Sequence, residues 1–152
     1  MNCQRGVVSR FSGLLFAHCA VFFFVSCSIP NLETADCKDS RDAVKQMYSV
    51  HFGGDMKPTA DNLKSGEKFL TEELISELRT PTDDKTDYFT QTDDYPKAFR
   101  IGSCSVSQPG ERVLIQILLF WKDDNRSEEK EIFVESVKRD GKWLISKVSA
   151  KD

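Results

Sequence analysis

Four side chains of this sequence are candidates for acid and base chemistry. Tyr48 and His51 are three residues apart, so they would share one face of a helix. Asp93 and Asp94 are adjacent in an acidic stretch. An imidazole or a carboxylate can act as a general base, which makes His51 and Asp93 candidate catalytic groups. The alternative is structural, because such a histidine often packs in a core and paired aspartates often cap turns.

Metal and cofactor motifs are absent or incomplete. Asp83, Asp87 and Asp94 have the spacing of positions one, five and twelve of an EF-hand loop. Lys85 stands where that loop needs an oxygen ligand, and Tyr88 stands where it needs glycine. The sequence also contains no zinc-type cluster, no phosphate-binding loop and no nucleophile-elbow motif. We therefore expect no cofactor and no metal ion.

The charge balance argues against nucleic acid as a partner. The chain has 152 residues, with 21 basic and 24 acidic side chains and a formal net charge of −3. Binding to phosphates requires concentrated positive charge, and the basic residues here are scattered. The length and a hydrophobic content of 39% are typical of one globular domain.

Residues 1–26 have the composition of an export signal. Arg5 and Arg10 are their charged residues, and the apolar run 11–25 follows. This run is shorter than the roughly 20 residues that a membrane-spanning helix needs. A basic start followed by a short apolar run is typical of a secretory signal peptide. A signal-anchor that remains in the membrane is the alternative.

The sequence FVSC at residues 24–27 resembles a bacterial lipobox, with phenylalanine where leucine is usual. The resemblance implies lipid attachment to Cys27 and cleavage before it. Because Ser28 rather than an aspartate follows, it also implies sorting to the outer membrane. Residues 27–39 would then be a lipidated tether, and residues 40–152 the folded domain. The alternative is an ordinary cleaved signal that releases a soluble secreted or periplasmic protein.

The cysteines fit this organisation. Cys3 and Cys19 would leave with the signal, and Cys27 would carry the lipid. Cys37 and Cys104 remain in an oxidising compartment, where we expect them to form a disulfide. Two buried free thiols are the alternative, and a catalytic thiol is less favoured.

Hydrophobic periodicity predicts helices in the first half of the exported chain. An amphipathic helix follows Asp39-Ser40 and ends at Gly53-Gly54. Residues 60–63 could form a short turn. A second helix starts after Thr71, a typical N-cap, and stops before Pro81.

Strands are predicted in the second half, at residues 98–106, 112–121, 130–137 and 143–148. Phe99, Ile101 and Ser103 should lie on one side of the first strand. The second is nearly all apolar, which predicts a central strand covered on both faces. Asp140-Gly141 is a hairpin signal. The order predicts an α+β fold, with N-terminal helices on one face of a curved antiparallel four-stranded sheet.

Four segments in this order resemble NTF2-like (cystatin-like) domains of unknown function in exported bacterial proteins. They are AVKQMYSVHF at 43–52, FLTEELISEL at 69–78, DYFTQTDDYPKAF at 87–99 and DGKWLISKV at 140–148. The resemblance covers residues 40–151. It implies a cone whose mouth can bind an apolar ligand, host catalysis or be filled by side chains. Enzymes of this type often use an aspartate with a histidine or tyrosine inside the cone.

The resemblance leads to candidate pocket residues and to three hypotheses. We expect Tyr48, His51, Asp93, Phe120 and Trp121 to line the cone. The leading hypothesis is a non-enzymatic envelope lipoprotein, membrane-anchored by its lipid, that binds a protein partner or a small apolar ligand. The alternative is a small hydrolase- or isomerase-type enzyme that uses Asp93 or His51. A third hypothesis is a structural role in the envelope.

Overall fold

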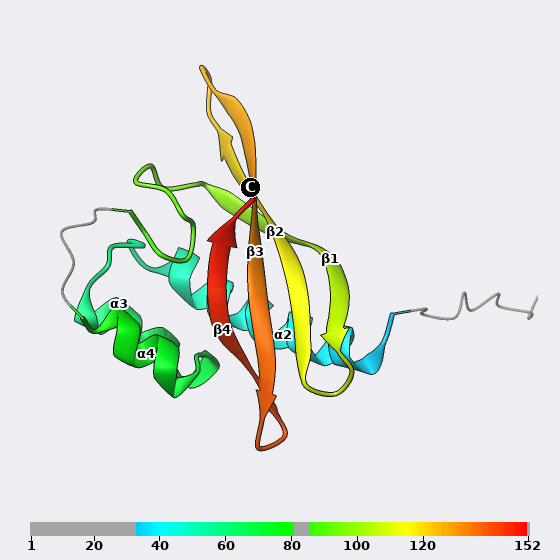
Figure 1. Ribbon diagram of the computed structural model, residues 1–152. Helices are drawn as coiled ribbons and strands as arrows, with labels where there is room; N and C mark the ends of the chain where they lie inside the picture. The colour runs from blue at the N-terminus through cyan, green and yellow to red at the C-terminus, as the bar shows by residue number, and fades with distance from the viewer. Residues whose placement is uncertain (1–32, 81–85, 152) are drawn as a thin grey trace, which may run out of the picture. The chain divides into compact units, whose positions relative to one another are not determined.

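The computed structural model describes residues 33–80 and 86–151 (Figure 1). The predicted signal at 1–26, the lipidation site Cys27 and the start of the tether lie outside the described residues. Their predictions therefore stay predictions.

Helix α2 runs from Ala35 to Gly53 and begins earlier than the sequence pattern predicted. The hydroxyl of Thr34 accepts a hydrogen bond from the Cys37 backbone N–H, which caps the first turn. At the other end, the Gly54 N–H donates to the His51 carbonyl. The buried side chains of α2 follow helical spacing and form the face that packs on the sheet: Cys37, Ser40, Val44, Met47 and Tyr48.

Two short helices follow, of which the first contacts α2 and the second contacts the last strand of the sheet (Figure 1). They are α3, Ala60–Gly66, and α4, Glu72–Leu78, with a single 3₁₀ turn at Glu67–Phe69 between them. Thr71 caps α4 by accepting a hydrogen bond from the Leu74 N–H, as its position predicted. The Thr71 N–H donates to the Ile145 carbonyl at 3.0 Å, which ties this region to the sheet.

The four strands form an antiparallel meander in the order β1-β2-β3-β4. Their bounds are Ala98–Gln108, Arg112–Lys122, Ser127–Arg139 and Lys142–Ala150. Asp140 and Gly141 both have positive φ, 49° and 78°, as a tight primed hairpin turn requires. Helix α2 crosses one face of the sheet (Figure 1), which gives the predicted α+β arrangement.

The core lies between α2 and the sheet. Alternate residues of β2 face it and are buried: Val113, Ile115, Ile117, Leu119 and Trp121. The intervening residues point to the opposite face, where Leu118 is buried but Leu114 and Phe120 are only half-buried. The expectation that β2 is covered on both faces is therefore wrong. On that face the positions of β3 that pair with β2 are Glu129, Glu131, Phe133 and Glu135, so three of the four are charged and partly shield the apolar side chains.

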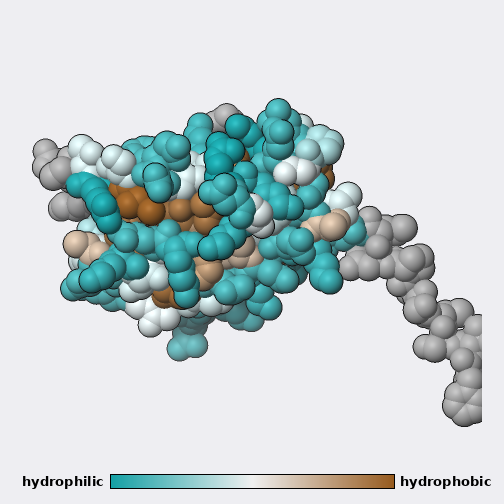
Figure 2. All heavy atoms as spheres, turned by 90° about the horizontal axis from the view of Figure 1, so that it is seen from below, coloured by the Kyte–Doolittle hydropathy of each residue, from teal (hydrophilic) through white to brown (hydrophobic). Residues whose placement is uncertain are grey.

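Few large hydrophobic side chains are exposed on the described surface. Among the described residues, Val50 is the one large hydrophobic residue that is exposed. Viewed from below, hydrophobic residues show as separate patches among hydrophilic ones (Figure 2).

A bulge in β1 sets the position of the disulfide. The register against β2 shifts between Ile101 and Cys104. The shift reverses the inside-outside alternation, so Cys104 points to the core and Ser103 is exposed. The prediction that Ser103 shares a side with Phe99 and Ile101 is therefore wrong.

Cys37 and Cys104 are joined by the expected disulfide, with Cα atoms 5.9 Å apart and a separation of 67 positions in sequence. The bond links the first turns of α2 to the edge strand of the sheet.

Candidate functional site

A histidine and an aspartate form a buried pair at the end of α2. Nε2 of His51 lies 2.8 Å from Oδ2 of Asp87, and the two side chains are 7% and 3% exposed. Within the described residues, this is the one hydrogen bond that the imidazole ring makes. His51 is in the last turn of α2, which fixes the direction of its side chain.

Asp87 accepts two further hydrogen bonds. The Thr90 hydroxyl donates to Oδ2 at 2.7 Å, and the Phe89 N–H donates to Oδ1 at 3.4 Å. A carboxylate that receives three donors is held in one orientation. The pair is therefore a rigid group, with Asp87 orienting the ring of His51.

The loop that carries Asp87 is closed on itself and bound to α2. The Asp87 N–H donates to the Thr92 carbonyl at 2.9 Å, and the Gln91 N–H donates to the Asp87 carbonyl at 2.7 Å. The Tyr48 hydroxyl donates to the Phe89 carbonyl at 2.8 Å. These contacts place Asp87 opposite His51 although the two are 36 residues apart in sequence.

Two tyrosines beside the pair are kept in their neutral form. Complete burial raises the pKa of Tyr48 well above its usual value, and the charges of Asp87 and Tyr88 add to the rise. Burial also raises the pKa of Tyr88, although the Val148 N–H, which donates to its oxygen, opposes the rise. Both side chains therefore act as neutral phenols at physiological pH.

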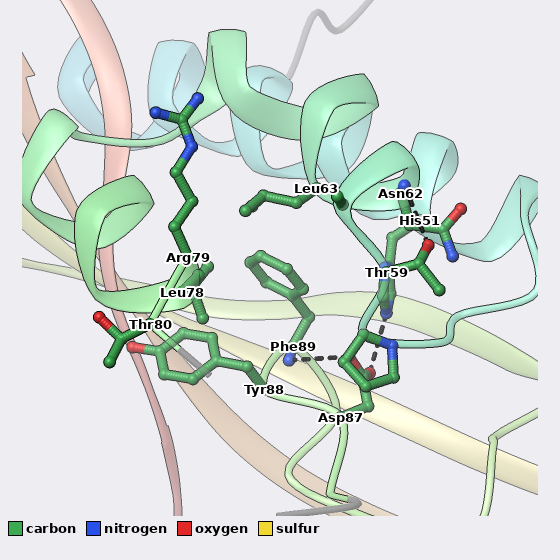
Figure 3. Close-up of a pocket in the computed structure, with 12 residues that line it drawn as sticks. His51, Thr59, Asn62, Leu63, Leu78, Arg79, Thr80, Asp87, Tyr88 and Phe89 are labelled. Atoms are coloured by element: carbon green, nitrogen blue, oxygen red, sulfur yellow. Dashed lines mark hydrogen bonds and ion pairs between the residues drawn. The ribbon is translucent and has the colours of Figure 1, made fainter. Parts of the chain in front are cut away.

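A pocket of about 320 Å³ opens next to the pair. It lies between the end of α2, α3, the end of α4 and the loop at Asp87 (Figure 3). Its lining residues are His51, Pro58, Thr59, Ala60, Asn62, Leu63, Leu78, Arg79, Thr80, Asp87, Tyr88 and Phe89. Figure 3 shows Leu63, Leu78 and Phe89 around the middle of this space, with His51 and Asp87 at one end.

The other polar groups of the lining are mostly engaged. The Arg79 guanidinium donates to Glu67 at 2.6 Å, and Figure 3 shows it directed away from Phe89. The Asn62 side chain donates to Asp55 and to the Lys57 carbonyl. The lining contains no cysteine and no serine. The described residues also hold no group of three or more histidine, cysteine, aspartate or glutamate side chains placed to bind a metal.

The structure brings one of the five predicted pocket residues, His51, to this pocket. Tyr48 is fully buried between α2 and the sheet. Trp121 is 5% exposed in the same core, and its Nε1–H donates to the Asp94 carbonyl at 2.9 Å. Phe120 lies on the opposite face of the sheet because successive strand residues alternate. Asp93 is exposed and does not line the pocket.

Asp87 was not predicted as the partner of His51. From the sequence it belonged to an incomplete calcium-loop pattern and to the segment 87–99. The local signal was the following Tyr88-Phe89-Thr90, because an aspartate can bond backbone and hydroxyl groups two and three residues ahead. That signal predicts a fixed carboxylate but not the distant histidine that it meets.

Among the described residues, no helix has the length and apolar character needed to cross a bilayer.

Comparison of the sequence with known proteins gave no match, either to a family model or to a curated protein.

Solved structures provide a likeness in fold. A chain in the type VI native effector–immunity complex Tae3–Tai3 from Ralstonia pickettii is similar at a TM-score of 0.50 and 11% identity, over 72% of this chain and 91% of that one. A protein of unknown function from Bacteroides thetaiotaomicron has a TM-score of 0.47 and 17% identity, over 74% and 89% of the two chains. At such identities, the likeness to the Tae3–Tai3 chain supports the α+β fold of helices on a curved four-stranded sheet.

Proposed function

We propose that this chain is an exported, lipid-anchored protein of a bacterial cell envelope. Its folded unit, of the NTF2-like (cystatin-like) type, binds a protein partner and does not catalyse a reaction. The lipobox-like sequence ending in Cys27 supports the anchor. The disulfide between Cys37 and Cys104 supports an oxidising compartment outside the cytoplasm.

The observation that carries the binding function is the filled interior. Tyr48 and Trp121 occupy the space between α2 and the sheet, where an enzyme of this type would hold its substrate. Asp93, the other candidate catalytic group, is exposed and does not line the pocket that His51 borders. Because the interior is packed, recognition is left to the outer surface and to the pocket beside His51 and Asp87, called the lateral pocket below.

The structural neighbour is consistent with this function at the level of the scaffold. A chain of similar fold takes part in an effector–immunity complex. Because identity is 11%, the likeness supports a scaffold able to sit in a protein complex and says nothing of the partner.

The experiment captures the partner in its own envelope. The full chain with a C-terminal tag is crosslinked in intact cells, extracted with detergent and purified through the tag. We expect one protein in stoichiometric amount, and repeated recovery of the tagged chain alone would contradict partner binding.

The same strain tests the anchor. We expect Cys27→Ala to release the chain from the membrane fraction, whereas Cys19→Ala, a matched change within the apolar run, should leave it bound. Membrane retention of Cys27→Ala after a salt wash would contradict the lipid anchor.

The His51–Asp87 pair favours a second candidate, a small hydrolase- or isomerase-type enzyme. A carboxylate that orients an imidazole is the arrangement of a general base, and here it borders a pocket. This candidate requires turnover of a small substrate that His51→Gln abolishes and Asp93→Asn leaves unchanged. Turnover that survives His51→Gln would contradict it.

A further inference from the structure

We propose that the lateral pocket binds one phenol-type group, an aromatic ring that carries a hydroxyl. This inference rests on the proposed binding function and names the chemistry that the pocket recognises. The group could be a free small molecule or a tyrosine side chain of the partner, because both present the same ring and hydroxyl.

The size of the pocket limits its ligand to about one ring. Ligand pockets in proteins commonly measure roughly 300–1,000 Å³, and this one, at about 320 Å³, is at the lower limit. An apolar cavity of about 150 Å³ is already large enough for benzene. One substituted ring therefore fits, whereas a fused-ring or long-chain ligand would protrude.

The walls favour an aromatic ring. Leu63, Leu78 and Phe89 surround the middle of the space, so the ligand body should be apolar (Figure 3). The ring of Phe89 meets His51 edge-on at 5.0 Å and Tyr88 edge-on at 5.5 Å between centroids. A further ring beside Phe89 could extend these contacts in the geometry that aromatic pairs prefer.

The polar end favours a hydroxyl. Nε2 of His51 is bonded to Asp87, and Nδ1 has no bond within the described residues. In a neutral imidazole whose Nε2–H faces Asp87, Nδ1 is an acceptor, so it can receive the proton of a ligand hydroxyl. The negative charge of Asp87 disfavours a carboxylate at the same place, and Arg79 is already paired with Glu67.

The backbone around the pocket is held in uncommon conformations. Three non-glycine residues of the described chain have positive φ, and Asp140 belongs to the hairpin turn. The other two are Met56, shortly before Pro58, and Gln91, shortly after Phe89, with φ of 54° and 55°. Such conformations persist where the surroundings impose them, often around binding sites. Both positions lie close in sequence to residues that line the pocket, so the surrounding contacts impose the backbone conformation there.

The test measures binding of 4-methylphenol and toluene to the purified full chain by NMR titration. The two probes have the same ring and methyl group and differ in the hydroxyl. We expect saturable binding of 4-methylphenol, about tenfold tighter than toluene, because one hydrogen bond is added. Failure of 4-methylphenol to saturate the signals of Leu63 and Phe89, or equal affinity for both probes, would overturn the proposal.

Two surface variants check the location. Ala60 is exposed at the pocket lining, so Ala60→Trp should block the pocket and abolish binding. Lys64 is exposed on the same helix and does not line the pocket, so Lys64→Trp should bind as the unmodified chain does. Equal binding by both variants would place the probe elsewhere and overturn the proposal.

A double variant checks the polar end. His51→Phe with Asp87→Leu removes both members of the pair together, so that no buried charge is left alone. We expect the affinity for 4-methylphenol to fall to that for toluene and toluene binding to persist. An unchanged preference for the phenol would overturn the role of His51. If this variant does not fold, the comparison of 4-methylphenol with toluene on the unmodified chain still tests whether the pocket prefers a hydroxyl.

Competition distinguishes the two sources of the phenol group. If 4-methylphenol releases a captured protein partner, the natural group is a side chain of that partner. If the partner stays bound while the probe occupies the pocket, the natural ligand is a free molecule. Probe binding without any protein partner would contradict only the proposed partner, and a partner without probe binding would contradict only the pocket ligand.

Discussion

The two ends of helix α2 are fixed to the rest of the fold by different kinds of bond. Near its start, Cys37 is joined covalently to Cys104 of β1. Near its end, Tyr48 and His51 are hydrogen-bonded to the loop at Asp87 and Phe89. One helix thus has a crosslinked end and a polar end.

The difference separates stability from recognition. The crosslink leaves no buried donor or charge in need of a partner, and no pocket residue belongs to it. At the polar end, a histidine, an aspartate and a tyrosine are buried, which is costly unless each is hydrogen-bonded. Such groups can form hydrogen bonds with a ligand, and they lie at or beside the pocket. Changes at the first end should therefore alter stability alone, and changes at the second should alter both stability and binding.

Removal of the disulfide should have the largest effect on stability. We expect Cys37→Ala with Cys104→Ala to lower the free energy of unfolding by about 4 kcal/mol, because a closed loop of this length restricts the unfolded chain. Equilibrium urea unfolding measures the change, and the unmodified chain under reductant is the matched control. The affinity of the folded variant for 4-methylphenol should not change. A large loss of affinity would contradict the claim that the disulfide end of α2 affects stability alone.

Removal of Asp87 should have the next largest effect. Asp87→Ala leaves three buried donors without their acceptor, so we expect a loss of about 2 kcal/mol together with weaker binding of 4-methylphenol. Asp93→Ala is the control, because this exposed residue should contribute within about 0.5 kcal/mol. Equal losses from the two variants would show that the buried pair has no special role.

High pH should weaken the polar end. Because the pKa of Tyr48 is raised in the folded state, the folded protein keeps this proton while the unfolded chain loses it. The stabilisation is complete below about pH 10 and falls as pH rises above it, by up to about 1.4 kcal/mol per pH unit. Urea unfolding between pH 9 and 11 measures the slope. Tyr48→Phe should be less stable at neutral pH but show a shallower slope, and an unchanged slope would assign the effect to other groups such as Tyr88.

The sequence was informative where local pattern determines structure. Periodicity predicted α2 and the four strands, and Thr71 and Asp140-Gly141 act in their predicted cap and turn. The start of α2 was placed too late because Thr34, the residue that caps it, precedes the apolar period. The cysteine count identified the two cysteines that pair, because Cys37 and Cys104 remain once the predicted signal and Cys27 are set aside.

The candidate site was less predictable because it depends on contacts between distant segments. His51 was identified from its type and its helix face, but Asp93 was chosen as the candidate catalytic carboxylate and Asp87 was not. Both aspartates lie in one acidic stretch, and only the hydrogen bonds that close the loop decide which of them turns inward. Phe120 and Trp121 were assigned to the same pocket although adjacent strand residues point to opposite faces.

The bulge in β1 is a local irregularity that determines a long-range contact. Its one extra residue decides which side chain of β1 reaches α2. A Cβ at Gly102 would clash with Oε1 of Gln116, the atom that accepts hydrogen bonds from the Ser103 N–H and hydroxyl. Gly102→Ala should displace the Gln116 side chain and lower stability by about 1 kcal/mol, the contribution of the hydrogen bonds that fix the bulge. Gln116→Ala removes the same bonds without a clash, so the two losses should be similar and should not add in the double variant. Additive losses in urea unfolding would mean that Gly102 serves the backbone of β1 itself, and the bulge would then hold Cys104 in place without help from Gln116.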